Sequence, residues 1–283
     1  MFVAPMRTGG LEAPLQNDNY IFEPQLDGQR LILSMEVGHV RLYSAHGFDL
    51  TSLYPELHLM PVADGEDVVL DAVLAVVDPA TGRLDREQLA RRYRLKKRMD
   101  IREASIRCPV HCFVFDILRY KGEDIRDWPL ERRKALLDEA LTDNRHYSRM
   151  PYLEGEGAAL FETMGRSGLQ GLVAKDKRSP YRSGTSEGWL TILHYRYLDV
   201  KIAGYRKNQF GWLVEHGAKW RDVVSESVPL PYRQAFYGVA KLIVTGEDKD
   251  FVYVRPEIEA RLRYVKQLAD GSPVQPEFVS FVV

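Results

Sequence analysis

Charged and polar side chains gather in one octet near the start of the chain, Glu-Pro-Gln-Leu-Asp-Gly-Gln-Arg at residues 23–30. Apolar runs at 20–23 and 31–35 flank it and predict two strands. Asp27 and Gly28 are typical turn residues, so the octet should lie where one strand passes to the next. The pattern predicts a strand–turn–strand unit with the octet at its turn.

The octet resembles Glu-Pro-Lys-x-Asp-Gly-x-Arg, the nucleotide-attachment motif of ATP-dependent DNA ligases. In that family the motif lysine attacks the α-phosphate of ATP and carries AMP as a phosphoramidate. Gln25 stands at the lysine position. A carboxamide nitrogen is delocalised into its carbonyl group and is not a nucleophile, so the covalent route lacks its reactive atom.

Four further motifs extend the resemblance over the whole chain, and each departs from the family at a charged position. The strand expected at 68–77 has Val73 in place of a metal-binding glutamate, and Gln170 replaces another. Thr191 stands where a lysine neutralises the α-phosphate, and Gln275 where an arginine can orient pyrophosphate. With Gln25, these positions predict a degenerate catalytic site and no metal.

Other motif residues are retained. Phe115 lies in the strand expected at 113–118, which resembles the adenine-stacking motif, although a core aromatic is the commoner role. The resemblance implies that the nucleotide-binding residues are Glu23, Asp27, Gly28, Arg30, Phe115 and Lys175.

A basic run follows residue 90. It is either a solvated helix face or a surface that grips DNA phosphates. The second interpretation predicts DNA contacts from Arg91, Arg92, Arg94, Lys96, Lys97 and Arg98. Ala45 replaces a family arginine that contacts the nicked strand, which predicts poor selectivity for nicks.

The composition is that of an ordinary globular protein, with 283 residues, 45% hydrophobic and 28% charged residues, and a net charge of −1. This charge argues mildly against tight duplex binding without excluding a local basic face. Cys108 and Cys112 have no second ligand pair, so we expect buried thiols in a reducing cytoplasm and not a zinc site. No apolar run has the length of a membrane span.

The element pattern predicts an α+β protein. A nucleotidyltransferase domain of antiparallel sheets with flanking helices is expected at 1–198, including helices at 51–57, 129–137 and 158–168. An OB-fold β-barrel is expected at 199–283, with a helix at 231–245.

We therefore expect a non-catalytic protein of ligase fold that needs no cofactor and binds ATP weakly at most. It would bind nicked or ended duplex DNA, or join an active ligase or repair protein. One alternative is an active ATP-dependent ligase that uses Lys175 or Lys177 as a relocated nucleophile. Another is a non-covalent ATP sensor that uses Arg30 and Phe115.

Overall fold

The computed structural model describes residues 1–13, 16–63, 67–166, 169–217, 220–225, 228–268 and 270–282. The chain divides into two compact units, Met1–Leu193 and His194–Val283. The division falls before the boundary expected after Leu198. The reason is that strand β12 (Arg196–Arg206) pairs with β17 (Glu259–Tyr264) from Arg196 onwards, which ties residues 196–198 to the second unit.

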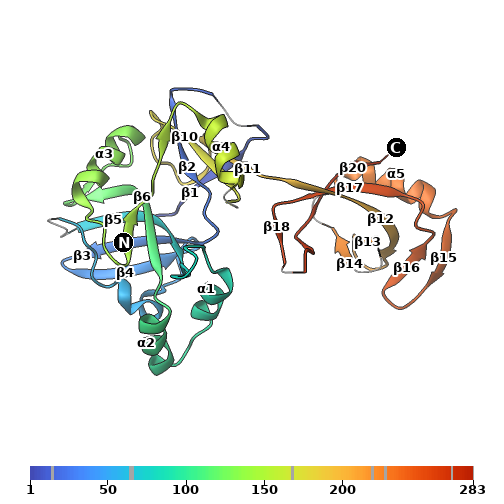
Figure 1. Cartoon of the computed structure of the whole chain (residues 1–283), viewed down its shortest axis with the longest axis horizontal. Coiled ribbons are helices and arrows are strands. Elements are labelled where there is room, and N and C mark those ends of the chain that lie inside the picture. The colour runs from blue at the N-terminus through green and yellow to red at the C-terminus, as the bar shows by residue number, and fades with distance from the viewer. Residues whose placement is uncertain are drawn as a thin grey trace. The chain divides into compact units, whose positions relative to one another are not determined.

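One sheet of the first unit has the order β4-β3-β5-β6-β7, with β8 parallel to β6 and all other pairs antiparallel (Figure 1). Both faces of its central strands are buried: Leu31 and Leu33 enter one apolar cluster, and Ile32 enters another. This explains why the central strands are nearly continuous apolar runs. The strands are β3 (Gln29–Glu36), β4 (His39–Ser44), β5 (Asp67–Ala75), β6 (His111–Tyr120), β7 (Glu123–Asp124) and β8 (Tyr147–Arg149).

The other sheet of this unit has the order β1-β11-β10-β2-β9. Only the β1–β11 pair is parallel among its described strands. The octet begins at the end of β2, so it leaves this sheet and enters the first one at β3. The strands are β1 (Met6–Gly10), β2 (Tyr20–Pro24), β9 (Leu153–Glu154), β10 (Gly171–Asp176) and β11 (Gly184–Leu193).

In the first unit, α1 (Arg86–Tyr93) and α2 (Arg98–Arg107) lie near each other, whereas α3 (Leu130–Ala140) and α4 (Gly157–Arg166) lie apart on different sheets (Figure 1). Helix α3 packs on β6 and α4 on β10. The helix expected at 51–57 is wrong: the segment forms two 3-10 turns, η1 (Thr51–Leu53) and η2 (Pro55–Leu57). Fully buried Tyr54 separates them. The expected helix end at Gly168 lies outside the described residues.

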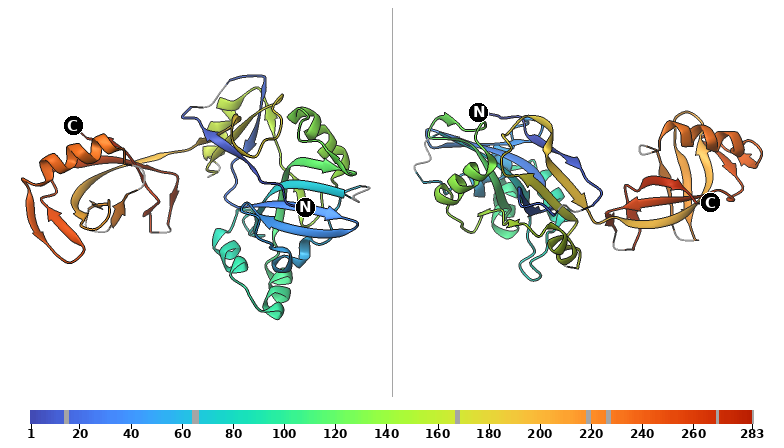
Figure 2. Two further views of the ribbon diagram at one scale, coloured as in Figure 1. Left: turned by 180° about the vertical axis from the view of Figure 1, so that it is seen from behind. Right: turned by 90° about the horizontal axis from the view of Figure 1, so that it is seen from above.

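Within its described residues, the second unit consists mainly of an antiparallel seven-stranded sheet with one helix, α5 (Leu230–Ala240), alongside it (Figure 2). Trp212 packs among Phe236, Phe278 and Phe281 at its core. The helix ends before the expected Thr245, because β15 begins at Val244. The remaining strands are β13 (Trp212–His216), β14 (Trp220–Val224), β15 (Val244–Glu247), β16 (Phe251–Val254) and β20 (Glu277–Phe281), and a separate pair, β18 (Lys266–Gln267) with β19 (Pro273–Val274).

The predicted α+β class is confirmed. Closure of the second unit's strands into an OB-type barrel stays a prediction.

Candidate functional site

A cavity of about 430 Å³ opens where the two sheets of the first unit meet. The backbone N–H of Gln25 donates to the carbonyl oxygen of Gly171 at 2.9 Å, which fixes the octet to the start of β10. Seven strands contribute to the wall: β1, β2, β3, β5, β6, β10 and β11. The lining residues are Arg7, Thr8, Glu23, Pro24, Gln25, Leu26, Gly28, Arg30, Val73, Phe115, Met150, Val173, Lys175, Trp189 and Thr191.

Most of the residues predicted for the catalytic and nucleotide-binding site meet in this cavity. Gln25, Val73 and Thr191 share it with the retained Glu23, Gly28, Arg30, Phe115 and Lys175. Asp27 and Gln170 line a second cavity of about 680 Å³, and Gln25 borders both. Gln275 belongs to the second unit, between β19 and β20.

Gly28 is required by a close approach of two chain segments. A Cβ atom at this position would lie 2.4 Å from Val73 Cγ1 and 2.5 Å from the carbonyl oxygen of Leu74. No real side chain tolerates such contacts, so the turn of the octet can lie against β5 only with glycine.

Phe115 is buried and also borders the cavity; its role in stacking on adenine stays a prediction. Its side chain is only 4% exposed, yet it forms part of the cavity wall. The Arg30 guanidinium carbon lies 4.5 Å from the ring centroid and the Lys175 Nζ lies 4.0 Å from it. Cations at these distances are attracted to an aromatic face. Two of the protein's own cations therefore contact the Phe115 ring at the cavity wall.

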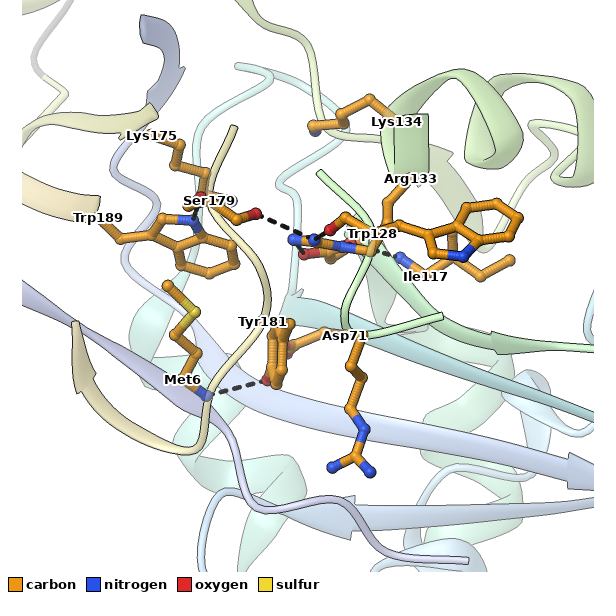
Figure 3. A network of polar contacts seen from close by, with 12 residues as sticks. Met6, Asp71, Ile117, Trp128, Arg133, Lys134, Lys175, Ser179, Tyr181 and Trp189 are labelled. Carbon is orange, nitrogen blue, oxygen red and sulfur yellow. Dashed lines mark hydrogen bonds and ion pairs between the residues drawn. The ribbon is translucent and has the colours of Figure 1, made fainter. Parts of the chain in front are cut away.

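Lys175 is a buried amine with an altered acidity. Its Nζ lies 2.6 Å from Glu23 Oε2, while Lys134 of α3 pairs with the other carboxylate oxygen. Burial lowers the pKa of Lys175 to about 8, against the opposing effect of Glu23. Figure 3 shows Lys175 and Trp189 reaching the same space from neighbouring strands. Of the two candidate relocated nucleophiles, Lys175 lines the cavity and Lys177 instead pairs with Glu154 at 2.6 Å.

Arg30 is held in place by a buried carboxylate. Its Nε and Nη2 donate to the two oxygens of Asp71 at 2.5 Å each, and Nη2 also donates to the Met6 carbonyl. The Tyr181 hydroxyl donates to Asp71 and accepts from the Met6 N–H (Figure 3). Burial raises the pKa of Asp71, and Arg30 opposes that shift. Asp71 thus positions Arg30 at the cavity.

The substituted positions provide few ligands for a metal ion. Thr191 Oγ1 donates to Thr8 Oγ1 at 2.7 Å, which joins β11 to β1. Glu23 is the one carboxylate among the lining residues, and both of its oxygens face lysines. In the described part of the chain, no three His, Cys, Asp or Glu side chains are close enough to bind a metal together. These residues do not fit the Mg²⁺ that the ligase reaction uses.

The basic run is not uniform. Arg92 is only 2% exposed, and its guanidinium donates to Glu56 at 2.8 Å and to the carbonyls of Leu53 and Cys108. It holds α1 to the 3-10 turns and is not presented to a phosphate, contrary to the prediction. Arg91, Arg94, Lys96, Lys97 and Arg98 are exposed as predicted.

Sequence reasoning missed the buried pairs behind the cavity. Arg133 of α3 makes two hydrogen bonds to Asp116 of β6, at 2.8 and 2.9 Å, with both side chains fully buried. It also donates to the Ser179 carbonyl (Figure 3). A helical pattern predicts α3, but nothing local marks Arg133 and Lys134 as inward-facing cations.

Residues 10–192 match the family profile of the ATP dependent DNA ligase domain. The chain belongs to the ATP-dependent DNA ligase family.

Two kinds of relative illustrate the range of the family. The SPbeta prophage-derived DNA ligase-like protein LigB of Bacillus subtilis (strain 168) is 32% identical over 284 residues, covering 100% of both chains. The multifunctional non-homologous end joining DNA repair protein LigD of Mycobacterium tuberculosis (strain H37Rv) is 28% identical over 95% of this chain. The match spans only 37% of LigD.

Solved structures show the same fold. The ligase domain of M. tuberculosis LigD superposes with a TM-score of 0.60 at 24% identity, covering 99% of this chain and 94% of that one. A Lig E DNA ligase gives 0.65 at 15% identity, covering 98% and 99%. Within the described residues, no helix has both the length and the apolar character needed to cross a membrane.

Proposed function

We propose that this protein is a non-catalytic member of the ligase family that acts in the cytoplasm as a DNA-binding or accessory subunit in the processing of DNA ends or nicks. The observation that carries the proposal is the composition of the 430 Å³ cavity, where Gln25, Val73 and Thr191 meet. A carboxamide, an alkyl group and a hydroxyl stand together where the resemblance expects a nucleophile, a carboxylate and a lysine. Family membership supports DNA as a partner.

Lys175 favours one alternative, an active ligase with a relocated nucleophile. A lysine with a pKa of about 8 is partly uncharged at neutral pH and can attack an electrophile. Its amine, however, lies over Phe115 and against Glu23. By the resemblance, Phe115 marks the base end of a bound nucleotide and not its phosphates. The position of Lys175 therefore argues against attack on the α-phosphate.

The test is incubation of the full chain with α-labelled ATP and Mg²⁺, followed by a denaturing gel. We expect no stable AMP adduct. Gln25→Lys alone should recover little, because removing one charged stabilising group costs roughly 10²–10³ in rate. The combined variant with Val73→Glu, Gln170→Glu and Thr191→Lys should recover labelling if the site has decayed from an active one.

A labelled unmodified protein would overturn the proposal. Peptide mapping of that label to Lys175, together with its loss in Lys175→Met, would assign the adduct to Lys175 and support the active ligase.

A further inference from the structure

A groove distant in sequence from the octet lies between the two 3-10 turns and α2. Its volume is about 840 Å³. Its lining residues include Pro55, Glu56, Lys96, Arg98, Ile101, Arg102 and Ile106. We call it the α2 groove.

Helix α2 is poorly covered by its own unit. Of its ten residues only Ile101 is buried, while Met99 is 84% and Ile106 is 70% exposed. Isolated helices of this length are marginal in water and depend on tertiary packing. Met99 and Ile106 are seven residues apart, about two turns, so they lie on one side of the helix. That side lacks an apolar partner among the described residues.

The charges of α2 are divided between its faces. Arg98 and Arg102 are four residues apart and line the groove with Lys96. No ion pair involves these three cations in the described part of the chain. Helical spacing places Asp100 and Glu103 away from them, and Glu103 pairs with Arg107 at 3.0 Å. Glu56, the one acid lining the groove, is neutralised by buried Arg92.

We propose that the α2 groove binds a segment of a protein partner that carries apolar side chains flanked by acidic ones. Ile101, Ile106 and Pro55 form the apolar surface for such a segment, and Lys96, Arg98 and Arg102 complement its charge. A DNA backbone would contact the cations of the groove. It would leave the apolar surface of the groove, including the exposed Ile106 side chain, without an apolar partner. The inference rests on the proposed accessory role and gives it a docking surface.

The experiment uses the full chain and a fluorescent synthetic peptide that places Leu and Glu at helical spacing. A second peptide of equal charge has every Leu changed to Gln, and a 20-base-pair duplex is the third probe. Ile106→Gln and Arg102→Gln test the groove. Leu242→Gln is the matched control, because Leu242 is also exposed (82%) and lies in the other unit.

We expect the Leu–Glu peptide to bind, and each groove variant to weaken it about tenfold, as loss of a central interface residue does. Leu242→Gln should change nothing, the Leu-free peptide should bind much less, and amide hydrogen exchange should show new protection in α2. Absence of peptide binding, or binding indifferent to Ile106→Gln, would overturn the proposal. Duplex binding that displaces the peptide and is weakened by Arg102→Gln alone would assign the groove to nucleic acid. None of these outcomes depends on the adenylation test.

Discussion

At the scale of single residues, the chemistry of the cavity depends on which nitrogen atoms it holds. Gln25 supplies an amide, Arg30 a guanidinium fixed by Asp71, and Lys175 an amine fixed by Glu23. Only the amine can change its charge near neutral pH, because burial has lowered its pKa. The titration of Lys175 therefore allows the free-energy cost of burying its charge in the cavity to be measured.

The pH dependence of stability should report on Lys175. Its pKa is about 8 in the folded protein and 10.5 in the reference state. Between these values the unfolded chain binds more protons, so the free energy of unfolding should rise with pH. The difference of 2.5 units corresponds to about 3 kcal/mol. Well below pH 8 both states are protonated and the folded protein carries the full cost of burying the charged amine.

The measurement is urea unfolding of the unmodified protein and Lys175→Met between pH 7 and 10. Titrating groups that do not interact with Lys175 cancel in the comparison, so the stability of the unmodified protein should increase relative to that of the variant as the pH rises. A constant difference would show that Lys175 titrates normally.

At the scale of elements, α3 is fastened to β6 by the fully buried pair of Arg133 and Asp116. Arg133→Met should destabilise the protein by roughly 3–5 kcal/mol, because it leaves the Asp116 carboxylate buried without its partner. The double variant Arg133→Met/Asp116→Leu should recover much of that loss. Chemical denaturation of Arg133→Met, Asp116→Leu and the double variant measures the coupling free energy between the two side chains. Destabilisations that simply add would show that the two residues do not act as a pair.

The α1–α2 segment separates two kinds of basic residue. Arg92 connects α1 to Glu56 and the 3-10 turns, whereas Arg94 and Lys97 are exposed and do not line the α2 groove. Arg92→Ala should therefore act mainly on stability. Arg94 and Lys97 are the better test of DNA binding.

At the scale of the whole molecule, a net charge of −1 means that DNA binding must depend on local cations. The Arg94→Ala/Lys97→Ala variant should weaken duplex affinity and reduce the slope of log K against log salt by about 2, about one unit per phosphate contact. The assay is fluorescence anisotropy over a salt series, with Lys241→Ala/Lys249→Ala as an equal-charge control. An unchanged slope would make the basic run a plain solvated face.

The sequence by itself determined the family, the α+β class and most strands, because the motifs and apolar runs that define them are local. It also determined the missing amine at Gln25, since functional groups are fixed by residue type. The second-unit helix was predicted too long, because periodicity does not mark where β15 begins.

Only the tertiary structure decided which residues meet. Gln25, Val73 and Thr191 come from three distant segments and share one cavity because β2, β5 and β11 converge there. Arg92 and Arg94 are equivalent by sequence, yet Arg92 is buried against Glu56 and Arg94 is exposed. Burial and ion pairing depend on what packs across the helix from elsewhere in the chain, and a local pattern does not contain that information.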